Sequence, residues 1–174
     1  MIWSAIKKRF IENGLKKGEK VICFTPYNVN KLEEEIASSG IDVNYYKQQD
    51  MLYFYHIEDI AKRLDGTKVG FNDMLDMLTG LDSSNPFRVL GTAIPDVSTK
   101  DRVTAQIEGE RVIHLRFENK PFSFLCPFDI SDIEPEERPR WLRELSANHH
   151  NLIYATSPDK AVAFETDLLN PVDD

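Results

Sequence analysis

Short apolar segments with strand character alternate along the chain with segments of helical character. Each strand-like segment is separated from the next by residues with helical periodicity. The strand-like segments lie within VICFT (21–25), MLYFYHI (51–57), PFRVLGTAIP (86–95), PFSFLCPFDI (121–130) and LIYATS (152–157). Because strands covered on both faces are nearly continuous apolar runs, this order predicts an α/β fold. We expect a three-layer sandwich, with a mostly parallel sheet of about five strands flanked by helices.

The intervening segments have the apolar spacing of amphipathic helices. We expect helices at 2–14, between Asn28 and Gly40, from Phe71 to Gly80, at 99–117 and within 136–149. Ligands of open parallel sheets bind beyond the carboxyl ends of the strands. The functional residues are therefore expected near those ends.

Chain length and charge restrict the classes of function. The 174 residues fit a single domain, which we place at 1–164, followed by an acidic tail at 165–174. The net charge of −8 argues against nucleic acid as a partner, because binding phosphates requires excess Lys and Arg. No apolar run approaches the roughly 18 residues of a membrane helix, so we expect no membrane partner.

The two cysteines and the N-terminal segment indicate a cytoplasmic protein. Cys23 and Cys126 lie far apart in apolar runs, as expected for reduced thiols rather than a disulfide framework. The N-terminal residues have no uninterrupted apolar region and no small-residue cleavage site, so they do not form a signal peptide.

Nucleotide and metal motifs are absent from the sequence. GLKKGEK (14–20) lacks the GxxxxGK[ST] spacing and is better interpreted as a helix end and turn, and no GxGxxG occurs. The adjacent His149 and His150 point in different directions on a helix, so they are poorly placed to share one ion. We therefore expect no cofactor and no metal ion.

Polar residues in apolar surroundings give the candidate site. Cys126 is near the carboxyl end of a predicted strand, and Asp129 follows in the loop above the sheet. Glu110 lies close to the apolar stripe of its helix, where a solvated carboxylate fits poorly. A buried core cysteine remains the simpler interpretation of Cys126, and His150 is interpreted as a capping or surface residue.

Aromatic residues are dense at 45–55 and 117–128. Core packing is the simplest explanation of both groups. A pocket lined by aromatic and aliphatic side chains with a few polar groups would also produce them.

In FIENGLKKGEKVICFTP (10–26) a predicted helix ends in a GL..GE turn before an apolar strand. This segment resembles the opening of the MEDS family, the methanogen/methylotroph sensory domain of DcmR-type regulators. LCPFD (125–129) is similar to the family's LC.YD motif, with Phe128 in the aromatic place. Overall the resemblance extends from about residue 8 to residue 156.

The order of the later motifs strengthens this resemblance. Glu110 stands sixteen residues before Cys126, and His149 precedes NLIY (151–154) as the family's histidine precedes its last strand. The family usually has a proline after that histidine, where this chain has His150. The family also begins with a strand before the first helix, whereas this chain begins almost at the helix. The resemblance therefore predicts an unpaired sheet edge that a partner or a second copy covers.

The resemblance implies a cytoplasmic sensory module with a RecA/KaiC-like fold that has lost its phosphate loop. It implies binding of a small organic molecule such as a hydrocarbon derivative. The polar contacts of that molecule would be Glu110, Cys126, Asp129 and His149.

Three hypotheses follow for the function. The first is a stand-alone module that binds a small, largely apolar molecule and signals through a partner protein, because no output segment is found in the sequence. The second is an enzyme with Cys126 as nucleophile, His149 as base, and Asp129 or Glu110 orienting the base. The third is a ligand-free subunit of a homo-oligomer with a degenerate RecA-like fold.

Overall fold

A parallel four-stranded sheet forms the centre of the protein. The computed structural model describes residues 2–57, 69–81, 85–91, 97–117, 119–128, 130–157 and 160–166. The strand order is β2-β1-β3-β4, with parallel pairing throughout. These strands are β1 (Lys20–Thr25), β2 (Leu52–His56), β3 (Phe87–Leu90) and β4 (Phe122–Leu125).

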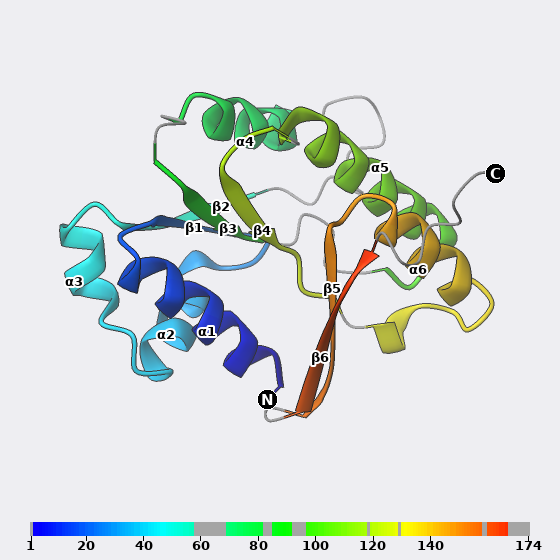
Figure 1. Ribbon diagram of the computed structural model, residues 1–174, viewed down its shortest axis with the longest axis horizontal. Helices are drawn as coiled ribbons and strands as arrows, with labels where there is room; N and C mark the ends of the chain where they lie inside the picture. The colour runs from blue at the N-terminus through cyan, green and yellow to red at the C-terminus, as the bar shows by residue number, and fades with distance from the viewer. Residues whose placement is uncertain are drawn as a thin grey trace.

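Helices cover both faces of this sheet. They are α1 (Ile2–Lys16), α2 (Val29–Ser38), α3 (Val43–Gln48), α4 (Val69–Thr79), α5 (Lys100–Phe117) and α6 (Arg138–Ser146). Figure 1 shows α4 and α5 on one side of the sheet and α1, α2 and α3 on the other. The predicted three-layer α/β sandwich is confirmed, whereas the short helix α3 was not predicted. Among the described residues, no helix combines the length and the hydrophobicity needed to cross a membrane.

Strand β1 shows why a sheet strand can form a nearly continuous apolar run. Val21 and Cys23 point into the core beneath α1, α2 and α3, whereas Ile22 and Phe24 point into the core beneath α4 and α5. Successive side chains of a strand alternate between the two faces, and here both faces are covered. A continuous apolar run is the result.

The turn between α1 and β1 is built around Arg88. Gly14 lies inside α1, two residues before its end, and Gly18 has the left-handed φ of 77° that follows many helices. The Arg88 side chain on β3 packs against Gly14, forms an ion pair with Glu19 and donates to the carbonyl oxygen of Phe10 at 3.1 Å. Gly14 and Glu19, the two ends of the GL..GE segment, therefore both contact Arg88.

The Gly14→Ala variant is expected to lose about 1–2 kcal/mol of unfolding free energy, because a well-packed site must make room for an added methyl group. The new Cβ would lie 2.6 Å from Cδ of Arg88 and 3.0 Å from Cγ2 of Val21. Alanine normally stabilises a helix interior relative to glycine, so packing reverses the usual sign. Urea denaturation measures the effect. Asn13→Ala, at an exposed neighbouring position, serves as the control and is expected to keep or raise stability. A more stable Gly14→Ala variant would contradict this packing.

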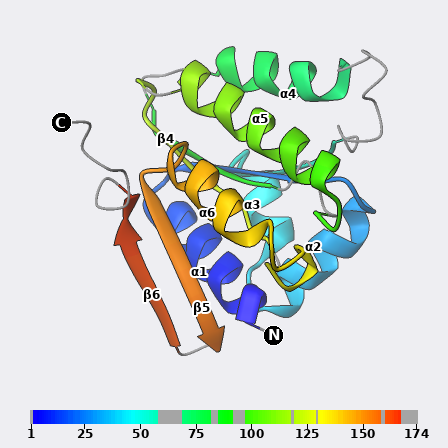
Figure 2. The same cartoon turned by 90° about the vertical axis from the view of Figure 1, so that its right-hand side faces the viewer.

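The predicted fifth strand forms, but the expectation that it joins the parallel sheet is wrong. Strand β5 (Asn151–Ser157) pairs antiparallel with β6 (Lys160–Glu165) in a separate two-stranded sheet. β6 was not predicted, although it contains the short apolar run AVAF (161–164), and all of its residues are exposed. Only two residues separate the strands, and so short a connection favours an antiparallel hairpin. Figure 2 shows this hairpin beside α6.

A third core cluster attaches α6 to α5. Val103 and Ile107 of α5 pack with Trp141 and Leu145 of α6, together with Ile133 from the connecting segment. α6 thereby carries the segment that follows it, including His149 and the start of β5, toward β4 and α5. Residues 167–174, which make up most of the expected acidic tail, lie outside the described residues.

Candidate functional site

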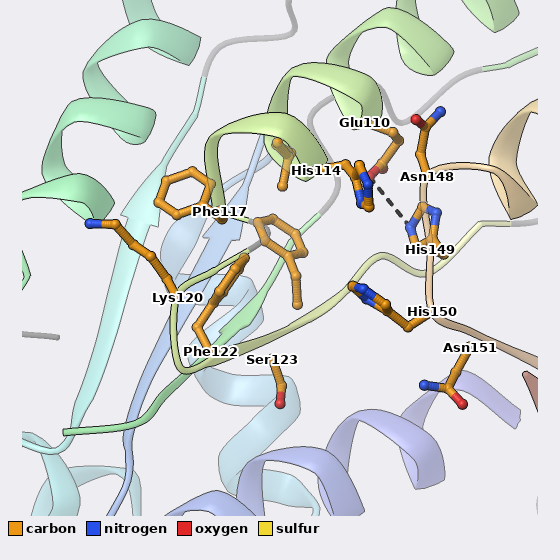
Figure 3. Close-up of a pocket in the computed structure, with 12 residues that line it drawn as sticks. Glu110, His114, Phe117, Lys120, Phe122, Ser123, Asn148, His149, His150 and Asn151 are labelled. Carbon is orange, nitrogen blue, oxygen red and sulfur yellow. Dashed lines mark ion pairs between the residues drawn. The ribbon is translucent and has the colours of Figure 1, made fainter. Parts of the chain in front are cut away.

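Glu110, Cys126 and His149 come from three distant parts of the sequence and meet at one point. Glu110 is on α5, Cys126 directly follows β4 and His149 follows α6. One donor atom from each lies within 4.8 Å of the others, and Nε2 of His149 is 3.4 Å from Oε2 of Glu110 (Figure 3). The structure thus brings together three of the four residues singled out in the sequence. Asp129, the fourth, lies outside the described residues.

A hydrogen-bond relay fixes the carboxylate of Glu110. The side chain of Gln106, one helical turn earlier on α5, donates through Nε2 to Oε1 of Glu110 at 3.0 Å. The indole Nε1 of Trp141 donates to Oε1 of Gln106 at 2.8 Å. Sequence reasoning missed both residues. The signal that could have found Gln106 is its i, i+4 spacing from a carboxylate on the apolar side of a helix.

His149 is held in a defined tautomer. Its Nδ1 lies 2.8 Å from the carbonyl oxygen of Leu145, which can only accept, so Nδ1 carries the proton. In the neutral ring, Nε2 therefore presents a lone pair toward Glu110. The hydroxyl of Thr166, after β6, donates to the carbonyl oxygen of His149, and its amide donates to that of His150 at 3.1 Å. The end of the hairpin thereby fixes the backbone of this segment.

Burial sets the protonation of the two acidic groups. Desolvation raises the pKa of Glu110, and His149 and hydrogen bonds from Cys126 and Gln106 oppose this rise only in part. Burial raises the pKa of Cys126 well above its usual value, and the neighbouring carboxyl group of Glu110 raises it further. Near neutral pH the thiol is therefore protonated.

The raised pKa of Glu110 predicts how stability depends on pH. The folded protein keeps this proton at pH values where the unfolded chain has lost it. The contribution of this proton to the free energy of unfolding is therefore complete below about pH 4.5, the ordinary pKa of the group. It is lost as pH rises through the folded-state pKa. A glutamine at this position does not ionise, so Glu110→Gln avoids the cost of ionising a buried carboxyl group. Its free energy of unfolding is expected to rise relative to that of the native protein as pH increases from 4 to 7.

Urea denaturation across that pH range measures the difference between Glu110→Gln and the native protein. The exposed Glu108→Gln is the matched control on the same helix, and its difference from the native protein is expected to stay nearly constant. Loss of stability in Glu110→Gln with rising pH would contradict the raised pKa.

A cavity of about 240 Å³ opens beside this cluster. Its wall combines aromatic side chains from α5 and β4 with polar groups from the segment after α6 (Figure 3). It is lined by Glu110, Ile113, His114, Phe117, Lys120, Phe122, Ser123, Phe124, Asn148, His149, His150 and Asn151. An apolar cavity of roughly 150 Å³ holds benzene, so this one is large enough for a small organic molecule.

Two further histidines lie in the cavity wall. The rings of His114 and His150 are 5.7 Å apart between centroids. His114 is one helical turn after Glu110, and this spacing, which places both on one face of α5, could have identified it from the sequence. His150 was interpreted as a capping or surface residue, and the structure agrees that it is exposed but also places it in the cavity wall.

Comparison with known proteins identifies the family. The model of the MEDS family, the methanogen/methylotroph, DcmR sensory domain, matches residues 3–150. No curated protein matches the chain. The matched segment covers most of the chain and contains Glu110, Cys126 and His149, and it ends just before β5. The chain therefore belongs to the MEDS family of sensory domains.

Proposed function

We propose that this sensory domain binds a small, largely apolar organic molecule in the cavity beside β4 and signals through a partner protein. The observation that carries this proposal is the placement of Glu110 and His149 in the wall of a 240 Å³ cavity. Small-molecule sites typically combine an apolar lining with a few fixed polar groups. The membership in a sensory family agrees with a binding role.

The cavity wall has the two parts that such binding needs. Phe117 and Phe122 lie 5.0 Å apart between ring centroids, and Phe122 contacts Phe124 edge-on at 6.3 Å. These rings would cover the apolar body of a ligand. The Glu110 carboxyl group, held by Gln106, and the His149 ring, held through Nδ1 by the carbonyl oxygen of Leu145, would orient a polar end.

The alternative of a thiol enzyme is disfavoured by the surroundings of Cys126. The thiolate is the nucleophile in such enzymes, and an adjacent base or cation usually lowers the pKa of the thiol. Here His149 lies within 4.8 Å of Cys126, but so does the carboxyl group of Glu110, and burial together with that carboxyl group raises the pKa of Cys126.

Cys126 is expected to react with iodoacetamide at pH 7 at least roughly tenfold more slowly than free cysteine, because its thiolate fraction is lower. Peptide mass spectrometry separates its rate from that of Cys23. Burial raises the pKa of Cys23 to about 12, so this residue provides an unreactive reference. Reaction of Cys126 as fast as free cysteine would favour the enzyme.

The exposed face of the β5–β6 hairpin supports an interface with a partner protein. Tyr154 and Val162 are a cross-strand pair on this hairpin, and Phe164 lies on the same side. Large exposed apolar side chains in one patch are typical of protein interfaces. Thr166 connects the end of the hairpin to His149, so a change at the cavity can reach this surface. Light scattering determines whether the partner is a second copy.

We also infer a distant relation to RecA/KaiC-like folds that have lost the phosphate loop. The parallel sheet between two helical layers and the absence of GxxxxGK[ST] from the sequence support this relation.

A melting-temperature screen tests the binding function. The probes are short-chain halogenated hydrocarbons, alcohols, amines and thiols, and a compound that binds the folded protein raises its melting temperature. His114→Trp enlarges a side chain of the cavity wall, and Arg111→Trp at an exposed position of the same helix is its control. At least one compound should stabilise the native protein and Arg111→Trp but not His114→Trp. No stabilisation by any compound, or equal stabilisation of both variants, would contradict the proposal.

A further inference from the structure

The donor atoms of the Glu110 cluster match the ligands of a zinc ion. Carboxylate oxygen, thiolate sulfur and imidazole nitrogen all bind Zn²⁺, and bonds of about 2.0–2.3 Å place tetrahedral ligands roughly 3.3–3.8 Å apart. Nε2 of His149 and Oε2 of Glu110 are already 3.4 Å apart. The remaining donor pairs lie within 4.8 Å, so side-chain shifts of roughly 1 Å complete the geometry.

The groups behind these donors are arranged as in metal sites. A metal-binding histidine usually donates its other ring N–H to a carbonyl or carboxylate, and binding carboxylates are themselves held by hydrogen bonds. The carbonyl oxygen of Leu145 accepts from Nδ1 of His149, and Gln106 donates to Glu110. Trp141 in turn fixes Gln106. These hydrogen bonds use Nδ1 of His149 and Oε1 of Glu110, whereas Nε2 and Oε2 lie 3.4 Å from each other.

Charge balance also favours a divalent cation. Without one, the site brings two acidic groups together within 4.8 Å, the buried Glu110 and the half-buried Cys126. Ionised Glu110 and Cys126 carry two negative charges, neutral His149 carries none, and one Zn²⁺ neutralises the set. The ion displaces the thiol proton to solvent as it binds. The sulfur ligand selects Zn²⁺ over Mg²⁺ or Ca²⁺, which bind oxygen.

We propose that Glu110, Cys126 and His149 bind one zinc ion whose fourth coordination position opens into the cavity. Sites with three protein ligands keep one position for water or another small ligand. Glu110 and His149 line the cavity whereas Cys126 does not, so the open position faces the cavity. A polar atom of an organic ligand can occupy it. The zinc site goes beyond the proposed binding function and does not depend on it.

Titration of the chelator-treated protein with Co²⁺ tests the site, with Zn²⁺ as competitor. One equivalent of Co²⁺ should give a sulfur-to-cobalt charge-transfer band in the near ultraviolet, which one equivalent of Zn²⁺ removes. Cys126→Ser should lose this band, whereas Cys23→Ala, which alters the other cysteine, should keep it. Gln106→Met should retain the band but bind the ion roughly 10–100-fold more weakly, as for other residues behind metal ligands.

A second measurement uses the native protein and does not depend on a folded variant. Zn²⁺ should protect Cys126 from alkylation and release protons on binding. Absence of a one-to-one band, a band that survives in Cys126→Ser, or unchanged alkylation of Cys126 with Zn²⁺ would each overturn the site. No organic ligand enters these experiments, so the zinc site and the proposed sensory function can fail independently.

Discussion

Arg88→Met is expected to lower the free energy of unfolding by about 3 kcal/mol, as for the loss of one partner of a buried ion pair. The side chains of Arg88 and Glu19 are only 13% and 15% exposed. Arg88 also lies over the ring of Phe10, with its Cζ 5.0 Å from the ring centroid, and donates to the carbonyl oxygen of that residue. Methionine preserves the unbranched apolar stem of the side chain but leaves the Glu19 carboxylate without its partner.

Urea denaturation of matched variants isolates this contribution. Arg116→Met removes the exposed ion pair with Asp76, whose side chains are 36% and 68% exposed, and should lose less than about 1 kcal/mol. The double variant Arg88→Met/Glu19→Gln should recover part of the loss, because it no longer buries an unpaired carboxylate. Equal effects of Arg88→Met and Arg116→Met would contradict a buried role for Arg88.

Phe117→Ala is expected to lower the free energy of unfolding by about 3–5 kcal/mol, the usual effect of removing a buried aromatic ring. Phe117 is 2% exposed at the end of α5 and packs on Phe122 of β4. Its loss leaves a void between the helical layer and the sheet, beside the cavity. Leu115→Ala on the same helix is the control, because Leu115 is 67% exposed.

Thermal and urea denaturation compare these two variants. Leu115→Ala should change stability by no more than about 0.5 kcal/mol. A loss below about 1 kcal/mol in Phe117→Ala would show that the α5–β4 contact is not part of the core.

The fold could be predicted from the sequence wherever burial on both sides leaves a local pattern. Val21 to Phe24 alternate between two cores, which makes β1 a continuous apolar run. The sheet partner of β5 could not be predicted in this way. Whether β5 pairs with β4 or with β6 depends on contacts between strands, and the apolar pattern of β5 alone does not contain them. β6 has the apolar run AVAF, but all of its residues are exposed, so its apolar character does not reflect burial in the sheet.

The site was predicted in part for the same reason. Cys126 follows a predicted strand and Glu110 lies near an apolar stripe, and both features are local. Their approach to His149 depends on the packing of α6 against α5 through Trp141, which no local pattern contains. Gln106 was missed because a buried glutamine resembles a surface residue until its two hydrogen bonds are known.

The binding of a small molecule in the cavity is tested most directly by side-chain NMR of the histidines. The ligand is the compound that stabilises the native protein most in the melting-temperature screen. Its addition should shift the ring signals of His149, His114 and His150, which line the cavity. His56, on β2 at the opposite edge of the sheet from β4, should not respond. Unchanged signals from the three cavity histidines, or a shift confined to His56, would contradict binding at this site.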